Sequence, residues 1–442
     1  MTKTAEAEMP WLVPHAFVPP PDYDYFKGFH SNIIYAKAGA GKTSLLFALE
    51  EDARRELGVL PVHWTPDLSG SPEPGTDLAN AQFTSILSAC ACQILNELPK
   101  DFKKRAKDMG KFGFLIDFLH RFLPREKKQI LSQKVPLLKN RLNSPYTLDG
   151  IAVELARSLK HIGFRGGLWL MVDRLDINSE VRRQAATHIM QSILSTLSFF
   201  EIPDFHWKMF LPSELEGALG ETTAIERERV SETHIAWDQK QLRVLIERRL
   251  RFALGDELVH VDQIYLADQL FSWLEGCGGL SPRGWLEYFR PIFAAFWEIY
   301  NTDGLSLLEA EKCVLDEGQW IAARKRSSLR LRFNPEASQV TVGMNSPRTL
   351  SPEELALFSY LHKEARYCSK REIYNKAYLP FVMQGKVGDA SSDDVVKYED
   401  LINTAISRLR KTFEPLPKDP VFLTTKKDRG YKLSLQAFRD DD

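Results

Sequence analysis

Small residues crowd the segment 36–44, whose composition and spacing suit a loop that binds phosphate. An apolar stretch at 32–35 leads into this loop, and an amphipathic stretch at 45–49 follows it directly. Backbone N–H groups of such a loop can surround a phosphate, and the positive end of the following helix adds to the attraction. The residues that we expect around the phosphates are Ala36, Gly39, Ala40, Gly41, Lys42, Thr43 and Ser44.

Two side chains of this loop have chemistry of their own. Lys42 would reach the β- and γ-phosphates of a nucleoside triphosphate, and the Thr43 hydroxyl would bind Mg²⁺. The order strand, loop, helix is that of a P-loop, although Ala36 stands where the usual pattern has its first glycine. A Gly-Lys-Thr turn that arose by chance is the alternative, but the elements on both sides favour the phosphate site. We therefore predict ATP and Mg²⁺ as cofactors and Lys42 as a catalytic residue.

A second apolar run ends in acidic residues. Residues 168–172 are apolar throughout, which is typical of a buried parallel strand, and Asp173 follows directly. A carboxylate at that end of a strand, beside the phosphate loop, would hold Mg²⁺ directly or through water. Asp176 would lie one short turn further on, where it could orient the attacking water; a surface-loop residue is the alternative. We predict Asp173 and Thr43 as metal ligands, and Asp173 and Asp176 as catalytic residues.

An arginine far along the chain also suits a bound phosphate. Ser281 can cap a helix and Pro282 suits its first position, so Arg283 would lie in the first turn. An arginine there opposes the helix dipole. We therefore interpret Arg283 as a residue that points at a phosphate.

The elements around these motifs alternate as in an α/β domain. A helix is predicted at about 42–57, a strand at 59–64 and another parallel strand at 207–211, close before Ser213. Between about 77 and 160 the spacing is helical throughout, which predicts a helical insertion. It includes a basic run that we interpret as a solvated helix face, with a nucleic-acid or partner surface as the alternative.

The region from about 15 to 300 resembles the STAND branch of AAA+-related ATPases. The resemblance rests on the loop 36–43, the strand ends at Asp173 and Ser213, and the stretches 235–250 and 281–283. It implies a parallel-sheet core with a helical lid, and an active site completed by a neighbouring subunit. In that family a polar residue at the end of this strand senses the γ-phosphate, a part that Ser213 or Glu214 could play. An arginine placed like Arg283 is a second sensor in the lid.

Two positions depart from the family. The residue after Asp176, where the family often has glutamate, is Ile177. The residue after Asp173, where a catalytic glutamate is usual, is Arg174. We therefore expect slow hydrolysis, or a switch that holds its nucleotide.

From Leu329 onward, the sequence predicts short strands as well as helices. The elements predicted after it are, in order, a hairpin at 329–342, helices beginning after Ser351 and Ser369, a longer helix at about 395–413 and a hairpin at 421–434. This block resembles the OmpR/PhoB type of winged helix-turn-helix, most specifically at 402–411, 420–425 and 429–433. In that family the long third helix enters the major groove and the hairpin wing touches the DNA backbone or minor groove.

The resemblance implies a DNA-binding face. Residues of the long helix that would face DNA are Asn403, Thr404, Ser407, Arg408 and Lys411, and wing residues that would contact phosphates are Lys426, Lys427 and Arg429. A winged helix that docks on a protein is the alternative. The acidic loop at 384–394 departs from the family and could block or reshape the DNA face.

Composition limits the classes of protein that fit. The chain has 442 residues, too many for one core, and a formal net charge of -1, so nucleic acid would have to meet a local basic patch. We find no apolar run of about 18 residues and expect no membrane span. The polar N-terminus and five scattered cysteines fit a cytoplasmic protein with free thiols.

The predicted fold is an α/β P-loop NTPase, with a parallel sheet core, helical insertion and helical lid, plus a C-terminal α+β winged-helix domain. The predicted parts are an N-terminal strap at 1–30, a P-loop ATPase core at 31–240 with its insertion at about 77–160, a helical lid and linker at 241–328, and a winged helix at 329–442.

The predicted function is an ATP-binding molecular switch that couples nucleotide state and oligomerisation to DNA binding, in transcription regulation, phage defence or mobile-element biology. The expected partners are ATP or ADP, double-stranded DNA, and further copies of the chain or a partner protein. One alternative is a signalling scaffold whose winged helix binds protein or locks an inactive state. Another is a DNA-translocating or loading enzyme, which the missing glutamate argues against.

Overall fold

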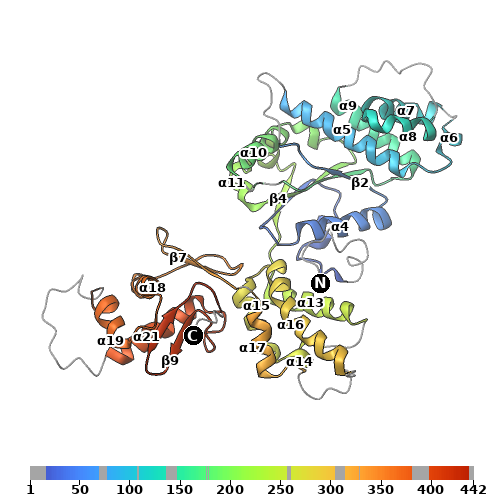
Figure 1. Cartoon of the computed structure of the whole chain (residues 1–442). Coiled ribbons are helices and arrows are strands. Elements are labelled where there is room, and N and C mark those ends of the chain that lie inside the picture. Colours follow the sequence, from blue (N-terminus) through green and yellow to red (C-terminus); the bar gives the residue numbers. More distant parts are fainter. Residues whose placement is uncertain are drawn as a thin grey trace. The chain divides into compact units, whose positions relative to one another are not determined.

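The computed structural model describes residues 16–68, 77–106, 109–135, 147–175, 177, 179–255, 260–303, 314–327, 329–380 and 398–437. These residues form two compact units, one ending at Ala236 and one beginning at Trp237. Each unit is described by itself (Figure 1). The chain passes from one to the other close to residue 240, the predicted end of the ATPase core. The four-part division of the chain as a whole stays a prediction.

The first unit is built on a five-stranded sheet with the order β2-β3-β4-β1-β5. Its strands are β1 (Asn32–Ala36), β2 (Leu60–Trp64), β3 (Leu168–Val172), β4 (Phe205–Pro212) and β5 (Ser231–His234). Every pairing between these strands is parallel. All residues of β1 and β3 are buried, which explains why both read as continuous apolar runs.

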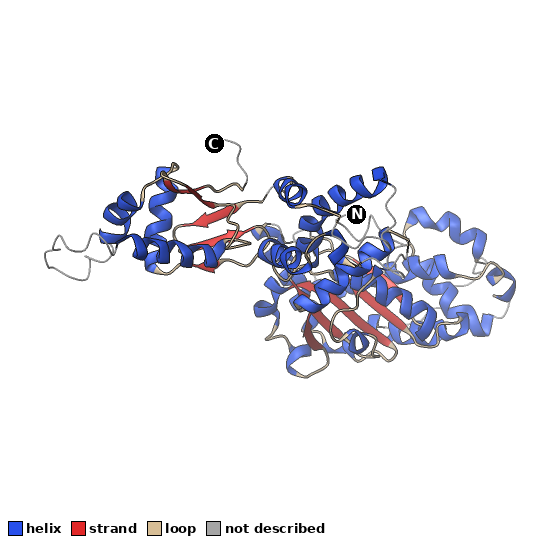
Figure 2. Cartoon of the chain, turned by 90° about the horizontal axis from the view of Figure 1, so that it is seen from below, coloured by secondary structure: helices blue, strands red, loops and turns tan. Residues whose placement is uncertain are grey.

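Helices surround the strands of this sheet (Figure 2). The α-helices are α3 (Tyr23–Phe26), α4 (Lys42–Asp52), α5 (Leu78–Glu97), α6 (Phe102–Arg105), α7 (Met109–Phe122), α8 (Lys128–Lys134), α9 (Leu148–Leu159), α10 (Glu180–Leu194), α11 (Glu216–Leu219) and α12 (Thr223–Glu226). Shorter helical turns are η1 (Ala53–Leu57), η2 (Arg125–Lys127), η3 (Lys160–Ile162), η4 (Leu197–Phe200) and η5 (Ser213–Leu215). The predicted helical insertion is thus present as α5 to α9.

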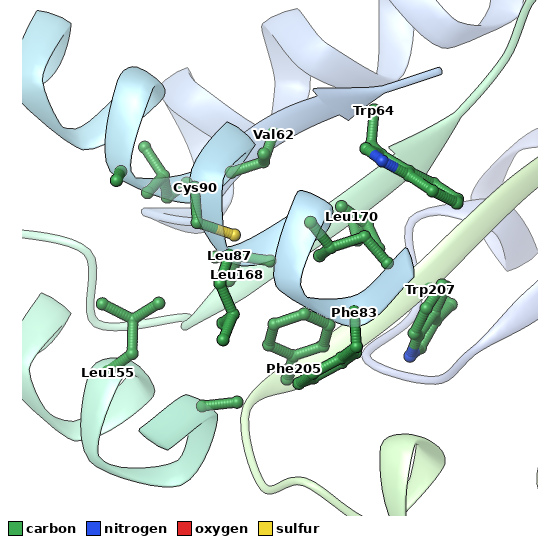
Figure 3. Close-up of a cluster of buried hydrophobic side chains, with 14 of the residues drawn as sticks. Val62, Trp64, Phe83, Leu87, Cys90, Leu155, Leu168, Leu170, Phe205 and Trp207 are labelled. Carbon is green, nitrogen blue, oxygen red and sulfur yellow. The ribbon is translucent and has the colours of Figure 1, made fainter. Parts of the chain in front are cut away.

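One hydrophobic cluster joins the insertion to the sheet. Figure 3 shows Phe83, Leu87 and Cys90 of α5 among side chains of the strands. Phe83 also stacks on Phe199, with ring centroids 4.1 Å apart. Among the described residues, α5 is the one helix that is long and apolar enough to cross a membrane by length and composition, which our search for apolar runs did not anticipate. Its buried face lies in this cluster, so packing against the sheet accounts for its apolar character.

The segment before β1 is tied to α4. The Tyr23 hydroxyl donates to an Asp52 carboxylate oxygen at 2.7 Å, and Lys27 Nζ lies 2.6 Å from the same oxygen. This pairing, together with burial, raises the pKa of the Tyr23 hydroxyl. The described part of the predicted strap, from residue 16 onward, is therefore held against the helix that follows the phosphate loop.

A buried lysine ties the same segment to the sheet. Lys208 of β4 is completely buried, and its Nζ donates to the carbonyls of Gly28 at 2.8 Å and His30 at 3.0 Å. The Trp169 ring lies 4.7 Å from this ammonium. Burial lowers the pKa of Lys208 from an ordinary 10.5 to about 7.

Replacing Lys208 with methionine should remove a pH dependence of stability. In the wild type, the unfolded state binds more protons than the folded state between pH values of about 7 and 10, so the free energy of unfolding should rise by up to about 4 kcal/mol across that range. Below pH 7 both states are protonated and this slope vanishes. Calorimetric unfolding of wild type and Lys208→Met across the range measures the difference, with the exposed Lys104→Met as control. A methionine variant that keeps the wild-type slope would contradict the assignment.

The second unit begins with a helical part. Its helices are α13 (Gln239–Ala253), α14 (Val261–Ile264), α15 (Ala267–Gly278), α16 (Pro282–Asp303) and α17 (Glu317–Lys325). Asp238 caps α13: its side chain accepts from Gln241 N at 2.7 Å, and the Asp238 N–H donates to Gln241 Oε1 at 3.1 Å. Helix α16 packs against α13, α15 and α17.

The rest of this unit is a winged helix. Its elements are β6 (Leu331–Asn334), β7 (Gln339–Val342), β8 (Arg348–Thr349), α18 (Pro352–Glu364), α19 (Lys370–Ile373), η7 (Tyr374–Tyr378), α21 (Tyr398–Phe413), β9 (Leu423–Lys426) and β10 (Gly430–Leu433). Strands β6, β7 and β8 form an antiparallel sheet, and β9 and β10 form the wing hairpin. Ser351 and Ser369 each begin their helix with a capping box, as their sequence context predicts. The acidic loop at 384–394 lies outside the described residues.

Candidate nucleotide and nucleic-acid sites

The predicted phosphate loop lies between two regular elements. Strand β1 ends at Ala36 and α4 begins at Lys42. Gly39 has a φ of 82° and Gly41 a φ of 92°, values in the left-handed region that favours glycine. The Ala40 N–H donates to the Lys37 carbonyl at 3.2 Å, which closes the turn. The glycines are therefore required where the chain reverses its direction between strand and helix.

The Lys42 side chain reaches back across this loop. Its Nζ donates to the Ala36 carbonyl at 2.6 Å and to the Lys37 carbonyl at 3.2 Å. The ammonium thus lies at the strand end of the loop, although Lys42 itself is the first residue of α4. A lysine held over a small-residue loop at a helix N-terminus is suited to a polyphosphate. Ser44, the last of the loop residues that we predicted, is half-buried in the first turn of α4.

The strand order brings Asp173 to the same helix terminus. The Thr43 hydroxyl donates to Asp173 Oδ2 at 3.2 Å, although the two residues are far apart in sequence. Burial raises the pKa of the Asp173 carboxyl, and the hydrogen bond from Thr43 and the charge of Lys42 oppose that rise. A hydroxyl and a carboxylate are oxygen donors of the kind that Mg²⁺ prefers. The donor set therefore fits the predicted metal.

The residue after Asp173 has an unusual backbone. Arg174 has a φ of 63°, in a region that costs a non-glycine residue energy, and its side chain is exposed. Its backbone N–H hydrogen-bonds the Asp173 carboxylate and so opposes the rise in the Asp173 pKa that burial causes. Sequence reasoning identified Arg174 only by the missing glutamate and gave no sign of this conformation. Asp176, the other predicted catalytic carboxylate, lies outside the described residues.

Ser213 comes beside the loop through strand pairing. Ala36, the last residue of β1, pairs with Pro212 at the end of β4, and Ser213 follows directly. Ser213 is half-buried and begins the turn η5. The predicted sensor is therefore next to the start of the phosphate loop.

A histidine and a glutamate also gather near this end of β1 and were not predicted. His234 Nε2 lies 2.9 Å from Glu216 Oε2, and the His234 ring is 5.6 Å from the Tyr35 ring. His234 ends β5 and Glu216 begins α11, so only the order of the strands brings them together. The sequence carries no local signal for this pair. Within the described part of the chain, no cluster of three or more His, Cys, Asp or Glu side chains could hold a metal by itself.

Arg283 lies in the second unit. It is exposed in the first turn of α16, and the Gly284 N–H donates to Ser281 Oγ at 3.4 Å, so the predicted serine cap is present. Its approach to a nucleotide stays a prediction, because the two units are described separately.

The long helix of the winged helix presents one polar face. Its exposed residues include all those predicted to face DNA: Asn403, Thr404, Ser407, Arg408 and Lys411. Its opposite face is buried in the domain core through Ile402, Ala405, Ile406, Leu409 and Phe413. The Tyr431 hydroxyl of the wing donates to Asn403 Oδ1 at 2.8 Å, so the wing directly orients one residue of the polar face.

Acidic Glu353 competes for one residue of this face. Arg408 Nη1 lies 3.8 Å from Glu353 Oε2, and the side chains are 65% and 28% exposed. A surface ion pair of this kind is weak. Arg408 can therefore exchange this carboxylate for a stronger anion.

The wing is basic, and more so than predicted. Lys427 and Arg429 are exposed at the hairpin turn, while Lys426 is half-buried. Lys426 lies 5.7 Å and Lys432 5.6 Å from the Tyr367 ring centroid. Tyr367 and Lys432 were not predicted, because the pairing of Cys368 with Tyr431 that brings them together is not local in sequence.

Two side chains of α21 fix the wing to the helix. Arg410 donates to the Leu423 carbonyl at 2.7 Å. The buried Glu414 carboxylate accepts the N–H groups of Val421 at 2.8 Å and Phe422 at 2.9 Å. Burial raises the Glu414 pKa to about 7, although these N–H groups lower it. These hydrogen bonds therefore fix the orientation of the start of the wing relative to α21.

Together these features define the class of fold: a P-loop NTPase on a parallel sheet of the order β2-β3-β4-β1-β5, followed by a winged helix. No protein-family model matches the sequence, and no curated protein matches it. The fold assignment rests on the chain's own strand order and loop geometry.

Several solved structures have some likeness to the chain. The ORC2 protein of Aeropyrum pernix, solved in ADPNP–ADP complexes, has a TM-score of 0.37 at 11% identity, over 96% of this chain and 93% of that one. Cdc6p of Pyrobaculum aerophilum has a TM-score of 0.35 at 11% identity, over 96% and 93%. The Aeropyrum pernix ORC1 protein in complex with DNA has a TM-score of 0.32 at 14% identity, over 97% and 92%. None of these likenesses carries an argument about the function of this chain.

Proposed function

We propose that this protein is a nucleotide-dependent switch, which binds ATP with Mg²⁺ in its first unit and double-stranded DNA through its winged helix. The observation that carries the nucleotide half is the hydrogen bond from Thr43 to Asp173 at 3.2 Å. It joins the helix after the phosphate loop to the acidic end of β3. Lys42, held across the same loop, supplies the cation for the phosphates.

Each group in this site has a separate task. Backbone N–H groups of the loop and the Lys42 ammonium bind the phosphates. Thr43 and Asp173 hold Mg²⁺, which when bound neutralises phosphate charge. Ser213 senses the terminal phosphate from the end of β4, and Asp176 orients the attacking water. Arg174, at the usual place of a catalytic glutamate, offers no base, so we propose slow turnover and a long-lived bound state.

Binding of DNA is supported by the exposed face of α21 and the basic wing. The polar face carries groups that can contact base edges in a major groove, and the wing carries cations suited to phosphates. The net charge of -1 means that this attraction is local. The finer assignments, a STAND-type core and an OmpR/PhoB-type winged helix, rest on the sequence motifs. We further propose that Arg283 reports the nucleotide to the lid and that copies of the chain assemble, in transcription regulation, phage defence or mobile-element biology.

Thr43→Val should remove the effect of Mg²⁺ on ATP binding. Valine keeps the branched shape but lacks the hydroxyl, so the metal loses one ligand. We expect affinity in Mg²⁺ to fall by about tenfold, which corresponds to about 1.4 kcal/mol. Titration of a fluorescent ATP analogue with and without Mg²⁺ measures this, with the exposed Thr84→Val as control. Equal Mg²⁺ dependence in wild type and Thr43→Val would show that the hydroxyl is not a ligand.

The experiment that tests the switch measures DNA binding in each nucleotide state. Fluorescence anisotropy of labelled duplexes, with ATP analogue, ADP or no nucleotide, should give different affinities for the wild type. Lys42→Ala should bind DNA equally in all three conditions. Affinity that falls as salt rises indicates phosphate contacts. A wild type that binds no duplex at low salt would favour the scaffold alternative, and one that binds equally in all nucleotide states would refute the switch.

A further inference from the structure

The end of helix α15 fits tightly against the winged helix within the second unit. A Cβ atom added to Gly276 would lie 2.5 Å from both Cα and O of Pro415, which follows α21. The Asn345 side chain donates to the Gly276 carbonyl at 2.6 Å, and the Met344 N–H donates to the Cys277 carbonyl at 3.0 Å. Backbone therefore meets backbone on both sides of this helix end, with no room for a side chain.

A buried arginine joins the two parts at a second place. Arg324 of α17 has a side chain that is only 2% exposed, and its guanidinium lies 5.3 Å from the Trp273 ring and 5.0 Å from the Trp320 ring. Its Nη2 donates to Asp419 Oδ2 at 2.5 Å. Asp419 lies in the segment between α21 and the wing. The charge of Arg324 is thus buried among aromatic rings of the lid and paired with a carboxylate of the winged helix.

The turn between β7 and β8 makes a third close contact with the lid helices. A Cβ at Gly343 would lie 2.4 Å from the Cys277 carbonyl and 2.6 Å from the Tyr288 hydroxyl. Backbone atoms of the lid and the winged helix therefore fit closely, and the buried charge of Arg324 in the lid has its partner, Asp419, in the winged helix. Such packing is typical of a domain interior, where small displacements are costly. Arg283 is on α16, which begins directly after the docked end of α15.

We propose that the lid helices α13 to α17 and the winged helix move as one rigid body, and that the movable joint of the protein is where Ala236 leads into Trp237. The predicted linker before residue 329 is then not a hinge. The face of α21 that carries Arg408 is exposed in this docked arrangement, so lid docking does not cover it. A nucleotide that moves the lid would therefore turn the whole DNA-binding face. Only the movement of the lid by nucleotide rests on the proposed function. The rigid connection between the lid and the winged helix does not.

Distance measurements between pairs of spin labels, by double electron–electron resonance, test in the full chain whether the lid and the winged helix move as one rigid body. Genetically encoded labels at exposed Arg290 in α16 and Lys363 in α18 report the distance within the body. Labels at exposed Val181 in α10 and Lys363 report the distance across the joint. We expect ATP analogue to shift the second distribution and to leave the first unchanged and narrow. A first distribution that shifts with nucleotide would overturn the inference.

Gly276→Val tests the docking surface directly. The added side chain must push Pro415 away, so the distribution between Arg290 and Lys363 should broaden, while ATP affinity stays at the wild-type value. Asp419→Ala, which takes the carboxylate away from the buried Arg324 guanidinium, should broaden it as well. Gly217→Ala is the matched control, because a Cβ there meets nothing within 4 Å.

These outcomes separate the inference from the proposed function. If Gly276→Val and Asp419→Ala both keep the narrow wild-type distribution, the docking surface does not hold the body together and the inference fails. If ATP analogue binds and moves neither distance in the wild type, the proposed switch fails, while the comparison of variants still decides the rigid body.

Discussion

Lys42→Ala is expected to weaken ATP binding by about 100-fold. A hydrogen bond to a charged group contributes about 1.5–3 kcal/mol, and about 1.4 kcal/mol corresponds to a factor of ten in affinity. The Lys42 ammonium lies at the strand end of the loop, on the carbonyls of Ala36 and Lys37, where phosphate oxygens would replace one of these weak acceptors. No other described side chain of the loop brings a cation across the turn in this way.

Lys37→Ala is the matched control for this substitution. It removes an equal charge from the same loop, but the Lys37 side chain is exposed and only its backbone carbonyl contacts Lys42. We expect a change of no more than about threefold, the size of a weak surface electrostatic effect. Isothermal titration with ATP and Mg²⁺ measures both variants. If the two variants lose affinity equally, the loop attracts nucleotide by net charge alone and Lys42 has no special role.

Arg408→Ala is expected to weaken duplex binding by about 10- to 100-fold. A good bidentate contact between an arginine and a base contributes about 1–3 kcal/mol of discrimination. Arg408 lies on the exposed face of α21, where its nearest acidic partner is Glu353 at 3.8 Å. The loss should be larger for the preferred sequence than for unrelated DNA, because base contacts specify while phosphate contacts only position.

Glu353→Gln should have the opposite effect. Removing the competing carboxylate frees Arg408 from a surface ion pair that contributes about 0.2–1 kcal/mol, so DNA binding should strengthen by about two- to fivefold. The side chain keeps its length, and Glu354 still completes the capping box of α18. Anisotropy titrations at matched salt measure both variants, with Lys418→Ala, exposed outside α21, as control. If Arg408→Ala binds like the wild type, Arg408 does not read DNA, and a strengthened Glu353→Gln would then reflect net charge only.

These two predictions also test whether the lid blocks the DNA-binding face and so holds the protein in an inactive state. Because the lid contacts the winged helix at Pro415 and Asp419, beyond the end of α21, the face that carries Arg408 is left exposed within this unit. A winged helix that docks only on protein would show no salt-dependent binding to DNA. Duplex titrations over a range of salt concentrations therefore distinguish the two uses.

Local sequence alone predicted much of the nucleotide site. The strand before Ala36, the start of a helix at Lys42 and the carboxylate at the end of β3 are confirmed, because each follows from a continuous apolar run or a short motif. The serine caps of α16, α18 and α19 are confirmed for the same reason: a cap involves residues only three apart. The exposed face of α21 follows from its helical period.

The tertiary structure alone decided which distant groups meet. The strand order brings Ser213 beside Ala36 and His234 beside Glu216, and pairing of Cys368 with Tyr431 gives the wing its aromatic centre. No short motif encodes these meetings, because they depend on the pairing of segments far apart in sequence.

The same holds for Gly276. In the sequence nothing local distinguishes it from the neighbouring Gly278 and Gly279. In the structure it is the place where the lid meets Pro415, since only a residue without a side chain lets the two backbones approach. The sequence by itself determined that the chain has a phosphate loop with its acidic partner and a winged helix. The tertiary structure decided that the winged helix is seated on the lid, because that contact is set by shape and by a buried charge, neither of which has a local pattern.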